Sequence, residues 1–182
     1  MQMITKPIAT ARTVLSWIAL LWIILLVSYF LPINAYGINP RSLGGLIGVV
    51  ASPFLHGSIS HLFANSLGLF FLGMLLGTFD RARAASVLVL LTLGSGMGTW
   101  LIGRPNSVHV GASGVIYGLM GYLLFGGVFS RNLKAVFVSL VVFFLYGGAV
   151  WGVLPHSQAV SWEGHLSGFI AGTVLAWKWR GK

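Results

Sequence analysis

The stretch Val14-Leu-Ser-Trp-Ile-Ala-Leu-Leu-Trp-Ile-Ile-Leu-Leu-Val-Ser-Tyr-Phe-Leu31 contains no charged residue and is long enough to cross a bilayer as a helix. It is too long for the core of a signal peptide, and no clear cleavage site follows it. Five further apolar stretches follow, at His61–Thr78, Ala84–Ile102, Ser113–Phe129, Leu133–Gly152 and Glu163–Trp177. The sequence therefore predicts an all-α membrane protein, a polytopic bundle of six transmembrane helices. Residues 1–182 are expected to form one transmembrane domain.

The composition excludes a water-soluble domain. Hydrophobic residues make up 57% of the chain and charged residues only 7%, whereas a soluble domain carries about 25% charged residues. The formal net charge is +9, but the basic residues stand in short groups between apolar runs. This pattern favours the lipid bilayer as the anionic partner and indicates no nucleic acid. The absence of cysteine excludes disulfides and thiol catalysis.

The distribution of basic residues predicts the orientation of the bundle. If the N-terminus is cytoplasmic, only Arg41 and Arg104 fall on the outer side. The inner side then holds Lys6, Arg12, Arg81, Arg83, Arg131, Lys134, Lys178, Arg180 and Lys182. This asymmetry follows the positive-inside rule and predicts that both termini are cytoplasmic. We expect a multi-pass integral membrane protein.

Three of the apolar stretches carry polar side chains at one common depth. They contain His61-Leu-Phe-Ala-Asn65, Gly111-Ala-Ser113-Gly114 and Gly164-His165-Leu-Ser-Gly168. With a rise of 1.5 Å per residue, the four polar side chains lie about 20–28 Å above the inner boundary. Polar groups inside hydrocarbon are costly, so their convergence predicts a functional site in the outer half of the membrane. These three stretches are also short and rich in glycine, which predicts that they line the interior.

Each motif also has a structural interpretation when it is taken alone. With 25 glycines in the chain, a Gly-x-Ser-Gly string arises easily by chance and packs helices closely. His61 and Asn65 share one helical face and could form only interhelical hydrogen bonds. His165 could be a core histidine with satisfied hydrogen bonds. Their joint occurrence at one depth favours the functional interpretation.

The residue types predict a nucleophilic hydrolase. Ser113 is the expected nucleophile, because it opens a helix whose N-terminus favours developing negative charge. His165 is the expected general base. An oxyanion hole would combine the Ser113 backbone N–H with side-chain donors from His61 and Asn65. Tyr117, one turn after Ser113, could stack on the His165 ring, although ordinary core packing would also explain it.

No acidic residue is placed to complete a catalytic triad. Asp80 lies at the opposite face of the membrane, and Glu163 is two residues from His165, a spacing that directs the side chains apart. A Ser113–His165 dyad is therefore predicted, without a metal or another cofactor. No His-Glu-x-x-His string exists, although His56, His109 and His156 in or near the outer loops leave a weak surface metal site open.

These motifs together resemble the rhomboid family of intramembrane serine proteases, in its minimal six-span bacterial form. The resemblance covers nearly the whole chain and includes Gly111, Gly114 and Gly168 as supporting glycines. It implies an intramembrane serine endopeptidase of the bacterial inner (plasma) membrane, which cleaves transmembrane or membrane-anchored proteins near the outer membrane boundary. Two positions depart from the family pattern. The first outer loop has Asn39-Pro-Arg41 where a Trp-Arg pair is common, and Gly164 stands where alanine is frequent.

The loops add expectations about access to the site. Pro32–Ser60 is too apolar for a free linker and is expected in the outer interface, partly re-entrant. The segment Val153–Ser161 would act as a flap, and a substrate helix would enter beside the fifth span, near Gly147-Gly148. The alternative function is a non-catalytic protein that binds transmembrane helices or serves quality control. A small transporter is also open, although the chain lacks the repeat symmetry that transporters show.

Overall fold

The computed structural model describes residues 2–130, 132–155 and 160–179, and the regular structure in these ranges is helical. The longer helices are α1 (Gln2–Ser28), α3 (Ile59–Phe79), α4 (Ala84–Ile102), α5 (Ser113–Phe129), α6 (Leu133–Tyr146) and α7 (Trp162–Lys178). The shorter helical pieces are η1 (Ile33–Tyr36), η2 (Gly44–Leu46), α2 (Ile47–Ala51), η3 (Ser52–Phe54) and η4 (Gly147–Val153). The all-α prediction is confirmed.

The helix boundaries follow the apolar stretches closely. Helices α4 and α5 have the predicted limits, because turn-forming and charged residues bound both stretches. Helix α1 is longer than predicted, since it begins at Gln2, and it ends at Ser28. The fifth stretch is divided, because α6 ends at Tyr146 and continues as the 3-10 turn η4.

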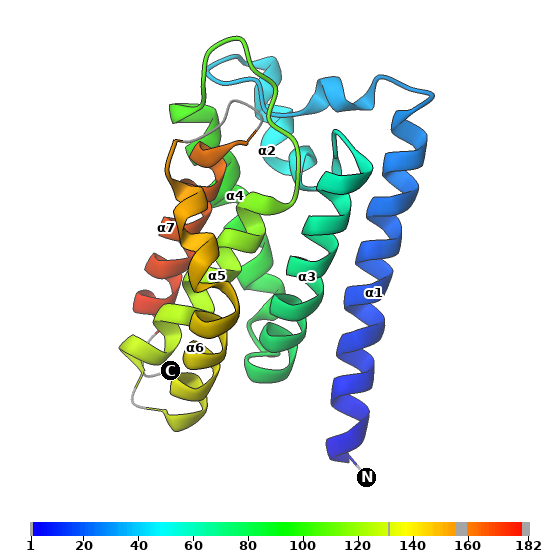
Figure 1. Ribbon diagram of the computed structural model, residues 1–182. Helices are drawn as coiled ribbons and strands as arrows, with labels where there is room; N and C mark the ends of the chain where they lie inside the picture. Colours follow the sequence, from blue (N-terminus) through cyan, green and yellow to red (C-terminus); the bar gives the residue numbers. More distant parts are fainter. Residues whose placement is uncertain (1, 131, 156–159, 180–182) are drawn as a thin grey trace.

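Helix α5 occupies the centre of the bundle and packs against α3, α4, α6 and α7. Its buried residues include Leu119 and Leu123, which join Leu72 of α3 and Leu91 of α4 in the main core. Helix α1 stands at the edge of the bundle and packs on α3 (Figure 1). The predicted interior position is therefore correct for α5, but α4 is as deeply buried as α3, with 28% of each span enclosed.

Glycine brings α5 and α7 into close backbone contact. A methyl group at Gly168 would overlap the carbonyl oxygen of Gly114, and one at Gly172 would overlap that of Gly118. Because these positions lack a Cβ atom, the two helices approach more closely than larger residues would permit. This contact places the start of α7 beside the start of α5.

The outer surface of the bundle suits a lipid environment. Four segments are long and apolar enough to cross a membrane, namely Thr10–Ser28, Ile59–Phe79, Ala84–Ile102 and Leu133–Val153. Large apolar side chains face outward, among them Phe137 and Phe144 of α6 at 67% and 79% exposure. The chain is an integral membrane protein. Figure 1 shows that α1 begins, and α7 ends, toward the same end of the bundle.

The segment between α1 and α3 folds over the opposite end of the bundle (Figure 1). Its backbone pairs with the loop before α5, since Ile38 and His109 exchange two hydrogen bonds of 2.9 Å. Short helix α2 rests on α4, where a methyl group at Gly96 would come within 2.7 Å of the Val49 carbonyl oxygen. The expectation that this segment is no free linker is confirmed, and its depth in the membrane stays a prediction.

Candidate active site

The turn that precedes α5 presents Ser113 at the helix start. Gly111 has a φ of 120°, a left-handed conformation that side chains rarely adopt. Its backbone N–H donates to the Ser52 carbonyl over 2.9 Å. The next N–H, of Ala112, points at Nε2 of His56 over 3.5 Å. The turn is thus held by the segment between α2 and α3. The backbone N–H groups of the helix start, which have no partner within the helix, lie at Ser113.

Helix α3 brings His61 and Asn65 against this turn. A methyl group at Gly111 would lie 2.6 Å from His61 Nε2 and 3.4 Å from Asn65 Nδ2, so both side chains abut the Gly111 backbone. The helix start is fixed by Ser58, whose side chain accepts from the His61 N–H over 3.1 Å. The Asn65 side-chain amide is buried, and Nδ2 has no hydrogen-bond partner among the described residues. A buried donor without a partner is costly unless something binds there.

Helix α7 places His165 beside Tyr117. The two rings stack with centroids 4.0 Å apart and an interplanar angle of 7°. The His165 Nδ1 atom forms a 2.9 Å hydrogen bond with the Gly152 carbonyl oxygen. His165 is buried, with 8% exposure. The stacking that the spacing predicted is present in the structure.

One cavity joins all of these side chains. It has a volume of about 900 Å³ and is lined by residues of α3, α5, α6, η4 and α7 and of the loops between them. Its lining includes all five polar or aromatic side chains predicted for the site, Ser113, His165, His61, Asn65 and Tyr117. The supporting glycines Gly111, Gly114 and Gly168 lie behind it, in the turn and in the α5–α7 contact. The structure therefore brings every predicted site residue into one region.

The two acidic residues are engaged elsewhere. Asp80 lies at the far end of the bundle, where it accepts a 2.5 Å hydrogen bond from the Tyr122 hydroxyl and pairs with Arg83 over 3.4 Å. Glu163 is fully buried, and its Oε1 atom pairs with Arg104 Nε over 3.0 Å. Both carboxylates thus bind groups of Tyr122, Arg83 and Arg104.

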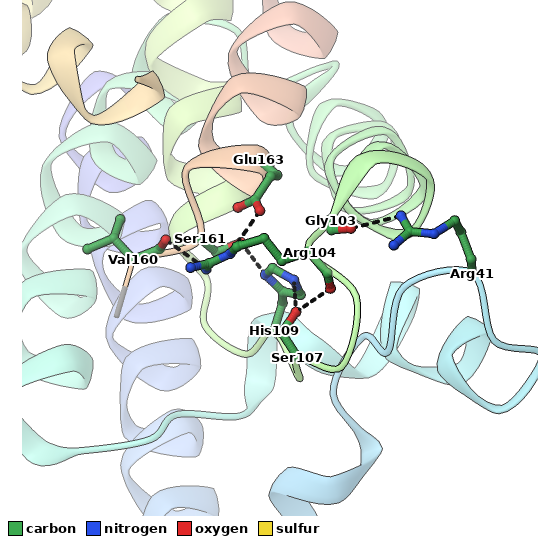
Figure 2. A network of polar contacts seen from close by, with 8 residues as sticks. All are labelled: Arg41, Gly103, Arg104, Ser107, His109, Val160, Ser161 and Glu163. Carbon is green, nitrogen blue, oxygen red and sulfur yellow. Dashed lines mark hydrogen bonds and ion pairs between the residues drawn. The ribbon is translucent and has the colours of Figure 1, made fainter. Parts of the chain in front are cut away.

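Sequence reasoning missed the network that surrounds Glu163 (Figure 2). Arg104 also donates to the Val160 carbonyl over 3.1 Å. His109 bonds to the Ser161 hydroxyl through Nδ1 and to the Ser107 hydroxyl through Nε2, over 2.6 and 2.8 Å. These contacts join the loop after α4 to the start of α7. Glu163 is a charged residue at the start of an apolar stretch, and such a residue requires a partner. This feature of the sequence could have predicted the ion pair with Arg104.

The Asn39-Pro-Arg41 segment caps α4. Arg41 has a φ of 58° and donates through Nη1 to the carbonyl oxygens of Leu101 and Gly103, over 3.0 and 2.8 Å. The latter contact is drawn in Figure 2. Carbonyl groups at a helix C-terminus lack partners within the helix, and a cation there satisfies them. Arg41, which belongs to the segment that departs from the family pattern, thus binds the C-terminal end of α4.

Two of the three loop histidines, His56 and His109, are buried. Burial and the neighbouring His61 lower the pKa of His56 to about 4. Burial also lowers the pKa of His109, against the opposing effect of the Glu163 carboxylate. Within residues 2–130, 132–155 and 160–179, no group of three or more His, Asp or Glu side chains could hold a metal ion. His156 and residues 157–159 of the expected flap lie outside these ranges.

The family model of the rhomboid domain matches residues 43–182 of this chain. The chain belongs to the rhomboid family. Relatives include an uncharacterized protein of Mycobacterium tuberculosis, 38% identical over 91% of this chain and 73% of the relative. A candidate rhomboid protease of Bacillus subtilis is 32% identical over 67% of this chain and 61% of the relative. A candidate rhomboid protein of Acanthamoeba polyphaga mimivirus is 29% identical over 84% of each chain. Together with the apolar helices, membership of the rhomboid family is consistent with membrane-embedded substrates.

Proposed function

We propose that this chain is an intramembrane serine endopeptidase that cleaves transmembrane or membrane-anchored proteins through a Ser113–His165 dyad. The observation that carries the proposal is the shared cavity, which is lined by Ser113, His165 and the buried, unpartnered amide of Asn65. Membership of the rhomboid family supports a protease activity of this kind. The reaction needs no cofactor.

The chemistry proceeds by acyl transfer. His165 takes the proton of the Ser113 hydroxyl as the serine oxygen attacks the scissile carbonyl, and it then gives this proton to the leaving amine. The tetrahedral oxyanion is stabilised by the Ser113 backbone N–H and by side-chain donors from His61 and Asn65. A water molecule then attacks the acyl-enzyme with His165 again as base, which releases the new carboxylate and restores the serine. Tyr117 holds the imidazole in place by stacking on it.

The proposed topology has six spans, with both termini in the cytoplasm and residues 1–182 as one transmembrane domain. The four long apolar segments support the first, second, third and fifth spans. Helices α5 and α7 have 17 residues each, or about 25 Å at 1.5 Å per residue, which suits shorter spans inside the bundle. Asp80 and Arg83 would mark the cytoplasmic end, and Arg104 the outer end. We assign the protein to the inner membrane of a bacterial cell.

The cavity also supports a route for the substrate. Its wall includes Leu67 and Phe71 of α3 and Leu145 and Tyr146 of α6, so it extends between these two helices toward the lipid-facing surface. A substrate helix would enter laterally there, beside the fifth span. Because a peptide bond must leave its helix before attack, substrates with small or helix-breaking residues near the outer interface should be preferred.

A fluorophosphonate probe tests the proposal directly, because it reacts only with an activated serine. The purified protein would be labelled in detergent and in liposomes, alongside Ser113→Ala and His165→Ala. We expect labelling of the wild type alone, together with cleavage of a transmembrane peptide that both variants fail to cut. Full cleavage by Ser113→Ala would refute the mechanism. Binding of the peptide without cleavage or labelling would instead favour a helix-binding or quality-control protein.

A further inference from the structure

The 3-10 turn η4 lies against the His165–Tyr117 pair and contacts it through two backbone carbonyls. The Gly152 carbonyl forms the 2.9 Å hydrogen bond with His165 Nδ1. The Ala149 carbonyl accepts a 2.8 Å hydrogen bond from the Tyr117 hydroxyl. The turn continues directly from α6, and Ala149 belongs to the lining of the cavity. One short segment thus binds both members of the stacked pair.

The chemistry of a carbonyl decides how the imidazole is protonated. A carbonyl oxygen can only accept, so the hydrogen bond requires that His165 Nδ1 carries a proton. In the neutral ring the lone pair is then on Nε2, the form that a general base needs. In a Ser-His-Asp triad a buried carboxylate performs this task, since it holds the imidazole in the correct tautomer and orientation. Here both acidic residues are committed to Arg83, Tyr122 and Arg104.

We propose that the Gly152 carbonyl is the positioning group of the dyad, which fixes the tautomer and orientation of His165, and that the Tyr117 hydroxyl holds the η4 turn in place for it. This inference rests on the proposed function. When His165 takes the serine proton on Nε2, the Nδ1–H bond to Gly152 persists and the dipole of the carbonyl stabilises the imidazolium. A neutral carbonyl inside a membrane orients His165 and stabilises the imidazolium without the free-energy cost of a buried carboxylate.

The contact also explains why residue 152 is glycine. A methyl group there would overlap the Tyr117 hydroxyl and come within 3.5 Å of His165 Nδ1. The turn can therefore reach the stacked pair only without a side chain. Gly148, in the same turn, has no atom within 4 Å of the position its Cβ would occupy. Gly152→Ala and Gly148→Ala are thus the same substitution in the same turn with opposite steric consequences.

The test compares turnover of a transmembrane peptide by the wild type, Gly152→Ala, Gly148→Ala and Tyr117→Phe. We expect kcat to fall about 10- to 100-fold in Gly152→Ala, less than the ~10⁴-fold cost of a wrong tautomer in a Ser-His-Asp triad. KM should change little in Gly152→Ala. Because Gly148 borders the proposed entry route of the substrate, Gly148→Ala serves as a control for kcat alone, which should stay close to the wild-type value. Tyr117→Phe keeps the stacked ring but releases Ala149, so a smaller loss is expected. Thermal unfolding of each variant checks that it folds.

Nitrogen-15 NMR of histidine-labelled protein gives a readout that a purely structural role would not move. The His165 signal, assigned by its absence in His165→Ala, should report a proton on Nδ1 in the neutral wild type and a mixture of tautomers in Gly152→Ala. A proton on Nε2 in the wild type, or equal kcat in Gly152→Ala and Gly148→Ala, would overturn the inference. A wild type no more active than Ser113→Ala would defeat the proposed function instead, and the tautomer would still test the contact with Gly152.

Discussion

Arg104 and Glu163 form a 3.0 Å ion pair in which the carboxylate is fully buried and the guanidinium is about one-third exposed. The pair joins the loop after α4 to the first turn of α7, two residues before His165. The Oε2 atom of Glu163 has no hydrogen-bond partner among the described residues, so the buried carboxylate is stabilised by its contact with Arg104. Removal of one member of a buried pair leaves an uncompensated charge, which costs more than the pair itself contributes.

We therefore predict that Arg104→Met lowers stability by about 1–3 kcal/mol, less than for a wholly enclosed pair because the guanidinium is partly solvated. The double variant Arg104→Met/Glu163→Leu should recover most of the loss, since it removes the buried charge as well. Thermal unfolding in detergent measures both. If the double variant were no more stable than Arg104→Met, the loss would come from the Arg104 contact with Val160 and not from the unpaired carboxylate.

Substitution of Asn65 tests the proposed oxyanion hole. Asn65→Ala removes the buried Nδ2 donor beside Gly111, and we expect kcat to fall by about 10²–10³-fold. His61→Ala should act in the same direction. The measurement is steady-state cleavage of a transmembrane peptide. Ser66→Ala is the matched control, because Ser66 is the buried neighbour of Asn65 and bonds to Leu62 and Trp22 instead. Unchanged turnover in both Asn65→Ala and His61→Ala would remove these side chains from the oxyanion hole.

The helices, and the side chains of the candidate site that line the cavity, could be predicted because they depend on local sequence patterns. Uninterrupted apolar runs fix the limits of α4 and α5, and a depth count along each run brings Ser113, Asn65 and His165 to one layer. The contacts that orient these groups could not be predicted in the same way. The Arg104–Glu163 pair links residues 59 positions apart, and the hydrogen bond of His165 involves a backbone carbonyl.

The break in the fifth stretch shows a second limit of sequence analysis. Leu133–Gly152 reads as one continuous apolar run, and hydropathy alone gives no reason for α6 to end at Tyr146. Gly147 and Gly148 marked the segment as flexible, but glycine is compatible with several backbone forms. In the structure, Tyr117 and His165 bind carbonyl groups of the 3-10 turn. These tertiary contacts favour the turn, and a local reading of the sequence does not show them.

The lowered pKa of His56 predicts that the folded protein loses stability in acid. This pKa is lowered to about 4 in the folded protein by burial and by His61, and the ordinary value is about 6.5. Between these values the unfolded chain binds more protons than the folded one, so the free energy of unfolding falls as the pH drops from about 6.5 to about 4. The loss approaches about 3 kcal/mol at the lower limit.

Thermal unfolding of the wild type from pH 7 to pH 4, compared with His56→Gln, tests this prediction. The variant keeps a neutral hydrogen-bonding side chain near the Ala112 N–H but cannot titrate. Its unfolding temperature should depend less steeply on pH than that of the wild type. His109, whose pKa is also lowered, will contribute to the slope that remains. Parallel pH profiles for the two proteins would show that His56 does not couple folding to protonation.

The contact between α5 and α7 predicts opposite outcomes for two glycine substitutions. A methyl group at Gly172 would overlap the Gly118 carbonyl, whereas one at Gly126 meets nothing within 4 Å. Gly172→Ala should therefore force the helices apart, with a loss of about 1–3 kcal/mol. Gly126→Ala should be neutral or stabilise α5 by up to about 1 kcal/mol, since alanine favours the helix.

Because α7 carries His165 seven residues earlier, Gly172→Ala should also lower peptide cleavage while Gly126→Ala preserves it. Equal unfolding temperatures and turnover in the two variants would mean that close backbone contact does not hold the dyad together.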